Sequence, residues 1–179
     1  MENPKEDVKK VIEQLVCRPT LTSQAETLRT YFTSDVNFFH LYINIAGGRS
    51  DLTAIYQMAQ IVFNYQAVQF HDIVYDEAAN AISVHMTVYI CPWQSLGREH
   101  GIVFFTLLEL VDHTLEDGRK VKLIKIQRDF FDRSITLTVL PIIGLVYNST
   151  KLRTFISHII VFLAKQACSV ARVLYPHKV

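Results

Sequence analysis

Hydrophobic residues recur with helical spacing in three stretches of the first 65 residues. In the first stretch, Asn3 can cap a helix with Pro4 at its first position. The residues on its apolar face are Val8, Val11, Ile12, Leu15 and Val16. A capping-box sequence at Ser23 predicts a second helix that ends within residues 32–35. The third helix is predicted to begin at Ser50, with a buried stripe made by Leu52, Ile55, Ala59 and Val62.

Strand patterns fill the rest of the first 131 residues. The aromatic-rich segment Val36–Ile45 predicts a strand or hairpin, and from residue 67 onward the hydrophobic period becomes that of strands. Polar turns, the last of which contains Asp117-Gly118, separate four predicted strands. These strands are Ala67–Tyr75, Ala81–Cys91, Gly101–Val111 and Val121–Phe131. Helices followed by an antiparallel meander predict one α+β domain, with three N-terminal helices packed on the sheet.

Residues 134–179 form an apolar extension to the domain expected over residues 1–133. Ile135–Val146 is almost wholly apolar, and Leu152–Leu174 has the pattern of a helix with several basic side chains. Such a helix can lie in a membrane interface, dock on a second copy in a homodimer, or complete the core, and these roles stay open. Its length, interrupted by Lys165, argues against spanning a membrane.

Composition narrows the class of partner. The chain is 50% hydrophobic and 20% charged, which excludes disorder, and its net charge of +1 gives no field for collecting nucleic acid. Cys17, Cys91 and Cys168 lack paired spacing, so we expect reduced core thiols in a cytoplasmic protein, with peripheral contact to an intracellular membrane left open. The charged N-terminus has no secretory pattern.

Cofactor chemistry is not indicated. His71 and His85 lie on neighbouring predicted strands, but no histidine falls into a metal-ligand spacing, so we expect no metal. No phosphate-binding loop, nucleophile elbow or Cys-His signature appears in the sequence. Chemistry, if the chain has any, is therefore expected to come from an apolar pocket without a cofactor.

The sequence Tyr31-Phe32-Thr33-Ser34-Asp35-Val36-Asn37-Phe38-Phe39-His40, with the order of helices and strands around it, resembles the nuclear transport factor 2-like (SnoaL-like) superfamily. The resemblance covers roughly residues 4 to 131 and is strongest to a fungal group with an apolar C-terminal extension. It implies that three helices close one side of a strongly curved sheet, forming a cone. It also implies a mostly apolar ligand cavity in the mouth of that cone.

The resemblance suggests two catalytic residues. Ketosteroid isomerase, one member, carries its general base at the position of His40, whose near-neutral pKa suits proton transfer, although a packed core histidine is the alternative. The isomerase's oxyanion-hole acid matches Leu110, or Glu109 if one residue is inserted. Strand alternation groups Glu109 with Val103, Phe105 and Leu107, which favours an inward orientation of its side chain without fixing it. The isomerase's oxyanion-hole tyrosine has no counterpart here, which argues against steroid isomerisation itself.

The predicted site therefore has His40 and Glu109 as catalytic residues, and its pocket-lining residues are Tyr31, Phe39, Tyr56, Trp93 and Phe105. Arg128 and Asp129 are assigned no chemistry, because neighbours on a strand face opposite ways and a surface ion pair is expected. The function expected from the resemblance is a cofactor-free isomerase or cyclase acting on a hydrophobic terpenoid or polyketide. The alternatives are a hydrophobe-binding protein at a membrane surface and a dimerising interaction module.

Overall fold

The computed structural model describes residues 1–40, 44–46, 48–92 and 96–131, together with Ser149, Lys151, Thr154, Phe155 and Ile159. The chain divides into two compact units, Met1–Asp132 and Arg133–Val179. All the helices and strands named below belong to the first unit. Trp93, the run Ile135–Val146 and most of the predicted helix Leu152–Leu174 lie outside the described residues.

The three predicted helices are present as α1 (Pro4–Val16), α2 (Leu21–Tyr31) and α3 (Arg49–Phe63). α2 begins two residues before the predicted Ser23, because Thr20 caps it and its Oγ1 accepts a 3.0 Å hydrogen bond from the Ser23 N–H. The Asn3 side chain makes no cap hydrogen bond at α1. α3 begins one residue before the predicted Ser50.

The six strands form one sheet in the order β2-β1-β6-β5-β4-β3. Their bounds are β1 Phe32–Phe39, β2 Asn44–Ile45, β3 Tyr65–Asp76, β4 Ala81–Ile90, β5 His100–Thr114 and β6 Lys120–Phe131. The predicted antiparallel meander is confirmed for β3 to β6. β1 pairs parallel with β6, so the sheet is mixed, and residues 32–35 belong to this strand rather than to the end of a helix.

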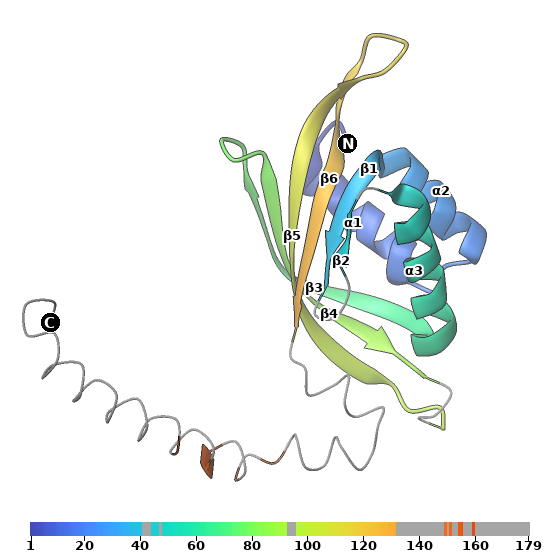
Figure 1. The fold of residues 1–179 in the computed structure, drawn as a ribbon, viewed down its shortest axis with the longest axis vertical. Helices are drawn as coiled ribbons and strands as arrows, with labels where there is room; N and C mark the ends of the chain where they lie inside the picture. Colours follow the sequence, from blue (N-terminus) through green and yellow to red (C-terminus); the bar gives the residue numbers. More distant parts are fainter. Residues whose placement is uncertain are drawn as a thin grey trace, which may run out of the picture. The chain divides into compact units, whose positions relative to one another are not determined.

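The three helices cover one face of the sheet, and the long strands curve around them (Figure 1). Irregularities in pairing interrupt β3 after Tyr65 and after Phe70, and the β5–β6 ladder after Glu109, and bulges of this kind bend strands. Alternate residues of β4 face the helices, and the buried set is Ile82, Val84, Met86, Val88 and Ile90. The hydrophobic core therefore lies between the helices and the concave face of the sheet.

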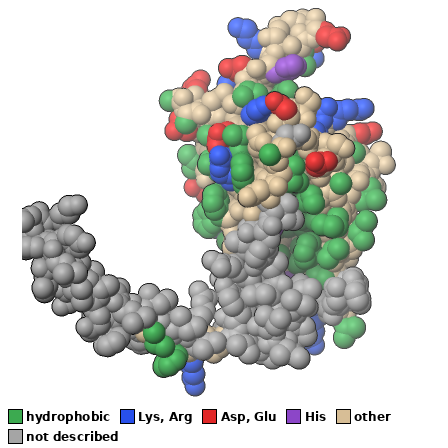
Figure 2. Space-filling model, in the orientation of Figure 1, with side chains coloured by type: hydrophobic (Ala, Val, Ile, Leu, Met, Phe, Trp, Pro, Cys, Tyr) green, Lys and Arg blue, Asp and Glu red, His purple; other side chains and the backbone are tan. Residues whose placement is uncertain are grey.

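α3 is less buried than its predicted stripe suggested. Leu52 is fully buried, whereas Ile55, Ala59 and Val62 are half-buried. Ile55 and Ala59 line a cavity. Figure 2 shows hydrophobic side chains gathered over the part of the unit where α3 lies, and the exposed Met58 belongs to this helix.

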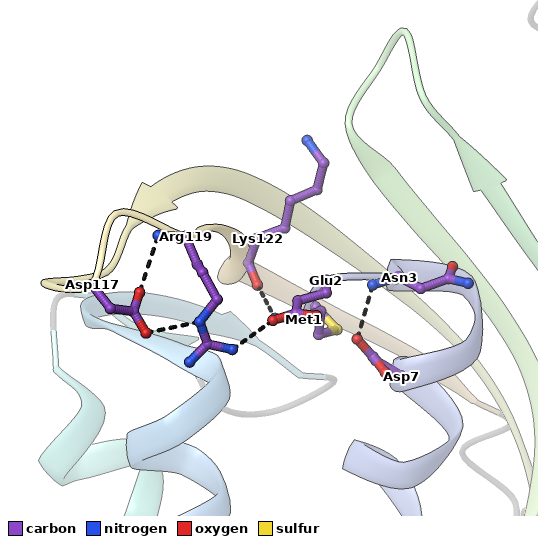
Figure 3. A network of polar contacts seen from close by, with 7 residues as sticks. All are labelled: Met1, Glu2, Asn3, Asp7, Asp117, Arg119 and Lys122. Carbon is purple, nitrogen blue, oxygen red and sulfur yellow. Dashed lines mark hydrogen bonds and ion pairs between the residues drawn. The ribbon is translucent and has the colours of Figure 1, made fainter.

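The first residues are tied to the β5–β6 hairpin (Figure 3). The Met1 amino group donates a 2.8 Å hydrogen bond to the Lys122 carbonyl, and the Lys122 N–H donates one of 2.8 Å to the Met1 carbonyl. Arg119 forms ion pairs with Glu2 and Asp117, each at 2.8 Å. Because these ion pairs are exposed, the backbone pairing of Met1 accounts for most of the attachment.

Two further predictions, on the cysteines and on membrane-spanning helices, can be compared with the structure. Cys17 is exposed at the C-terminal end of α1, so the prediction of a core thiol is wrong for this residue, while Cys91 is half-buried and Cys168 lies outside the described residues. Among the helices that the structure describes, none is long and apolar enough to cross a bilayer.

Candidate functional site

A cavity of about 130 Å³ lies between the helices and the concave face of the sheet. Its walls come from α1, α3, β1 and the four strands of the meander, and most of its lining side chains are aliphatic or aromatic. The polar side chains that line it are His40, Tyr56, Tyr65, Thr106, Gln127 and Asp129. A mostly apolar cavity with a few polar groups at one place is typical of a small-molecule site.

Asp129, which is half-buried, is the acid that lines this cavity. Its Oδ1 accepts a 2.8 Å hydrogen bond from Thr106 Oγ1, and both its carboxylate oxygens lie 3.1 Å from Gln127 Nε2. Burial raises the pKa of the Asp129 carboxyl from 3.8 to about 6, against the opposing effect of the bonds from Gln127 and Thr106. The group therefore changes between carboxylic acid and carboxylate close to neutral pH.

Gln127 links this acid to a tyrosine. Its Nε2 donates to Tyr56 Oη at 2.9 Å and faces Asp129 on its other side. The Tyr56 hydroxyl lies 3.1 Å from Gln127 Oε1, to which it can donate its own proton. Burial, and then the charge of Asp129, raises the pKa of both Tyr56 and Tyr65. Both phenols therefore stay protonated and are hydrogen-bond donors inside the cavity.

His40 follows β1 directly and lies in the cavity wall. Its ring packs between Phe38 and Phe131, with centroid distances of 5.7 and 4.7 Å. Burial lowers the pKa of His40, so the imidazole is neutral at pH 7. Its Nδ1 is buried and has no hydrogen-bond partner among the described residues. A buried ring nitrogen without a partner is costly, and a polar atom of a ligand could satisfy it.

Glu109 faces away from the cavity. Phe104, Thr106 and Leu108 of β5 line the cavity, and alternation sends Glu109 to the opposite face of the sheet. There its Oε1 lies 2.5 Å from Arg128 Nη1, with both side chains partly exposed. The prediction that Glu109 points inward is therefore wrong. Strand alternation correctly grouped Glu109 with Phe105 and Leu107, but this group lies on the outer face of the sheet and not on the face toward the cavity.

Of the residues predicted to line the pocket, some lie at the cavity and others lie elsewhere. Tyr56 lines the cavity. Phe105 lies on the outer face of the sheet, where it stacks on His85 with centroids 4.2 Å apart. Phe39 lies 4.8 Å from the Arg128 guanidinium and lines a second, more open pocket with His40, Arg128 and Asp129. Tyr31 lines a separate surface groove at α1 and α2. Trp93 lies outside the described residues.

Asp129, which has the most strongly shifted pKa among the acids of the cavity, was not predicted as a site residue. Strand alternation correctly places Arg128 and Asp129 on opposite faces of β6, but both were expected at the surface. Two signals could have found the site. The first signal is Thr106, a polar residue among the buried positions of β5. The second is on β6, where Gln127 and Asp129 share one face of the strand; Gln127 pairs with Leu108 and Asp129 pairs with Thr106. Polar residues on the buried face of paired strands indicate a hydrogen-bonded cluster.

Three helices on a curved, mixed sheet around an apolar cavity define a cone of the nuclear transport factor 2-like class. The chain belongs to the family described as the SigF NTF2-like domain, whose family model matches residues 1–170. The superfamily predicted from the sequence is thereby confirmed. No curated protein matches the chain.

Solved structures share the fold at low sequence identity. An NTF2-like protein of unknown function from Burkholderia pseudomallei is 14% identical with a TM-score of 0.56, covering 77% of this chain and 97% of its own. A candidate SnoaL-like polyketide cyclase from Jannaschia sp. CCS1 is 14% identical with a TM-score of 0.54, covering 80% and 96%. A hypothetical protein with a ketosteroid isomerase-like fold from Catenulispora acidiphila, in complex with trimethylamine, is 14% identical with a TM-score of 0.55, covering 74% of this chain and 90% of its own.

Proposed function

We propose that this protein is a cofactor-independent isomerase or cyclase that moves a proton within a small hydrophobic substrate. The observation that carries the proposal is Asp129, a half-buried residue whose carboxyl group lines an apolar cavity and has a pKa raised by desolvation to about 6. A structural acid gains nothing from being desolvated, whereas a proton-transfer group works best with a pKa near the working pH.

In this proposal the Asp129 carboxylate removes a proton from a carbon next to a carbonyl group. The electron pair moves toward the carbonyl oxygen and gives an enolate. The same carboxyl group then returns the proton to another carbon of the conjugated system, so that a double bond migrates and no atom is gained or lost. For a cyclase, the enolate carbon attacks a second carbonyl carbon instead, and the resulting alkoxide takes the proton.

The negative charge that develops on the substrate oxygen needs a hydrogen-bond donor to stabilise it. The Tyr56 hydroxyl is protonated, and Gln127 holds it at the cavity wall. His40 is the second candidate, since it lines the same cavity and its buried Nδ1 has no hydrogen-bond partner among the described residues. Hydrogen bonds to a forming oxyanion are worth more in an apolar cavity than in water. His40 thus takes the polarising role that the resemblance implied for Glu109, and Asp129 takes the general-base role that it implied for His40.

Cavity volume favours a small substrate. An apolar cavity of roughly 150 Å³ can hold one benzene ring. The 130 Å³ found here therefore suits one six-membered ring or a branched chain of similar size. A terpenoid or polyketide fits this description if a single ring enters the cavity. The likeness to a candidate polyketide cyclase and to a ketosteroid isomerase-like protein supports the reaction class only as an analogy of fold.

The same apolar walls support one alternative, a hydrophobe-binding protein that performs no reaction. The two functions differ in their dependence on Asp129. A binding protein needs the cavity's shape but not a carboxylate, so Asp129→Asn would preserve or improve its affinity for an uncharged ligand. An isomerase needs the carboxylate itself, and general acid–base groups contribute about 10²- to 10⁴-fold to rate.

A direct test uses a panel of small cyclic enones, including 3-cyclohexenone, incubated with the protein in deuterated buffer. NMR detects deuterium incorporation next to the carbonyl and migration of the double bond. We expect turnover by the wild type, a loss of roughly 10²-fold or more in Asp129→Asn, and an unchanged rate in Glu109→Gln, the matched control on the outer face. Binding of the enones without exchange in the wild type would favour the carrier, and equal exchange by Asp129→Asn would exclude Asp129 as the base.

A further inference from the structure

A second pocket, the outer pocket, lies where β1 ends beside β6. Within the described residues, the last pair of the β1–β6 ladder is Phe39 with Arg128, whereas β6 continues to Phe131 and pairs there with β5. The outer pocket has a volume of about 280 Å³. Its lining side chains are Phe39, His40, Arg128, Asp129, Phe130 and Phe131.

The outer pocket is bounded by side chains from both faces of the sheet. Phe130 is exposed on the outer face, and its neighbour Asp129 lines the cavity on the concave face. Phe131 follows on the concave side, where its ring lies 4.9 Å from that of Phe104, a residue of the cavity. His40 and Asp129 line the cavity and the outer pocket alike. The two spaces therefore adjoin at the residues to which the proposed reaction gives polarisation and proton transfer.

Aromatic rings make up half of the lining of the outer pocket. Phe39 is 36% exposed and Phe130 is 56% exposed, although both are large and hydrophobic. Large apolar side chains left exposed around a pocket are typical of a binding site. Aromatic side chains also pair favourably with a further ring, edge to face or offset. The lining therefore suits a planar ring.

The charged groups of the outer pocket argue against an anionic ligand. Arg128 already forms an ion pair with Glu109, and its guanidinium lies over the Phe39 ring. Asp129 is a carboxylate above about pH 6 and would repel a second negative charge. A neutral ring neither competes with Glu109 for the guanidinium nor meets this repulsion.

We propose that the outer pocket is the second half of the ligand site and holds the outer ring of a neutral, planar ligand with two fused or directly linked rings. The first ring of that ligand lies in the cavity, whose volume suits one six-membered ring. The inference rests on the proposed function, since the first ring is the one on which Asp129 acts. A bicyclic aromatic ketone has the required form, with its carbonyl ring in the cavity and its aromatic ring against Phe130 and Phe131.

The test is calorimetric titration of the full chain at about pH 8, where Asp129 is ionised. The ligands are 3-cyclohexenone, with one ring, 1-tetralone, with two fused rings, and 2-naphthoate, with two rings and a negative charge. The variant Phe130→Ala removes one aromatic wall of the outer pocket. Its matched control is Phe105→Ala, because Phe105 pairs with Phe130 across the strands, is exposed to a similar degree on the same face, and lines neither space. Circular dichroism checks that the variants fold, and Phe130→Leu replaces Phe130→Ala if that variant does not.

We expect 1-tetralone to bind roughly tenfold or more tightly than 3-cyclohexenone, and 2-naphthoate to bind more weakly than 1-tetralone. Phe130→Ala should weaken the binding of 1-tetralone roughly 3- to 10-fold and that of 3-cyclohexenone less than about twofold. Phe105→Ala should change neither affinity by more than about twofold. Absence of 1-tetralone binding, equal losses in the two variants, or tighter binding of 2-naphthoate would overturn the inference.

These titrations need no turnover, so the inference and the proposed function can fail separately. Binding of 1-tetralone that depends on Phe130, without deuterium exchange next to the carbonyl of any ligand, would count against the reaction and support the second half of the site. Exchange of 3-cyclohexenone that depends on Asp129, with 1-tetralone binding indifferent to Phe130, would keep the reaction and overturn the inference.

Discussion

Replacing Asp129 with Asn should change the pH dependence of stability in a way that no surface substitution can. The structure raises the pKa of this carboxyl from 3.8 to about 6, so its ionisation costs free energy in the folded state but not in the unfolded state. The favourable contribution of the protonated group is complete below pH 4 and is lost as the pH rises through about 6. Asn cannot ionise, so the variant escapes this loss.

The expected size follows from the shift. A shift of about two pKa units corresponds to roughly 3 kcal/mol, most of which develops between pH 4 and pH 8. The free energy of unfolding of Asp129→Asn, minus that of the wild type, should therefore rise by roughly 2 to 3 kcal/mol over this range. Any free-energy cost of placing the Asn amide beside Thr106 and Gln127 is the same at every pH, so it moves the whole difference curve up or down without changing its shape.

Urea unfolding at half-unit pH steps, followed by circular dichroism, measures this difference. Asp35→Asn is the matched control on the surface, where a hydrogen bond from Lys125 lowers the pKa of Asp35. Asp35 contributes stability above its unfolded pKa and loses it as the pH falls, so its difference curve should be small and of opposite sign. A flat difference curve for Asp129→Asn would refute the reasoning, because Asp129 would then ionise as it does in the unfolded chain.

Three other variants test the cavity and the core by the same unfolding assay. Thr106→Val removes the 2.8 Å hydrogen bond to the Asp129 carboxylate, so it should lower the free energy of unfolding by about 1.5 to 3 kcal/mol at pH 8 and by clearly less at pH 4. An equal loss at both pH values would contradict this reasoning. Burial lowers the pKa of His40, so the wild type loses stability as the pH falls below the usual histidine pKa of about 6.5 and the unfolded chain binds the proton more readily. His40→Phe lacks this loss, so its free energy of unfolding should rise relative to that of the wild type as the pH falls from 7 to 5. Leu52→Ala should cost about 2 to 5 kcal/mol at every pH, because Leu52 is fully buried where α3 meets the core; a loss below 1 kcal/mol would mean that α3 packs loosely there.

Local signals in the sequence were sufficient for most of the fold. Pro4 and the apolar spacing located α1, and the hydrophobic alternation with Asp117-Gly118 located the β5–β6 hairpin. These features depend on neighbours within a few residues. The parallel pairing of β1 with β6 joins residues about 90 positions apart, such as Phe39 and Arg128, and nothing local specifies it. The sheet was therefore predicted as antiparallel, whereas it is mixed.

The candidate site was harder to predict for a related reason. Alternation sorts β5 and β6 into two sets of residues but does not tell which set is buried when both contain apolar side chains. Phe105 and Leu107 made the outer set look like the core, so Glu109 was expected inside. The buried set of β6 contains Gln127 and Asp129, whose polar character looked like a surface. Only the packing of the helices on one face decides between the two sets, and that packing is non-local.

The central claim is that Asp129 is a half-buried acid that lines the ligand cavity and titrates near neutral pH. Carbon-13 NMR of aspartate-labelled protein measures this directly, with the Asp129 carboxyl signal assigned by its absence in Asp129→Asn. We expect a titration midpoint of about 6, and a further shift of that signal when 3-cyclohexenone is added. A midpoint near 4 that is insensitive to the enone would contradict the account.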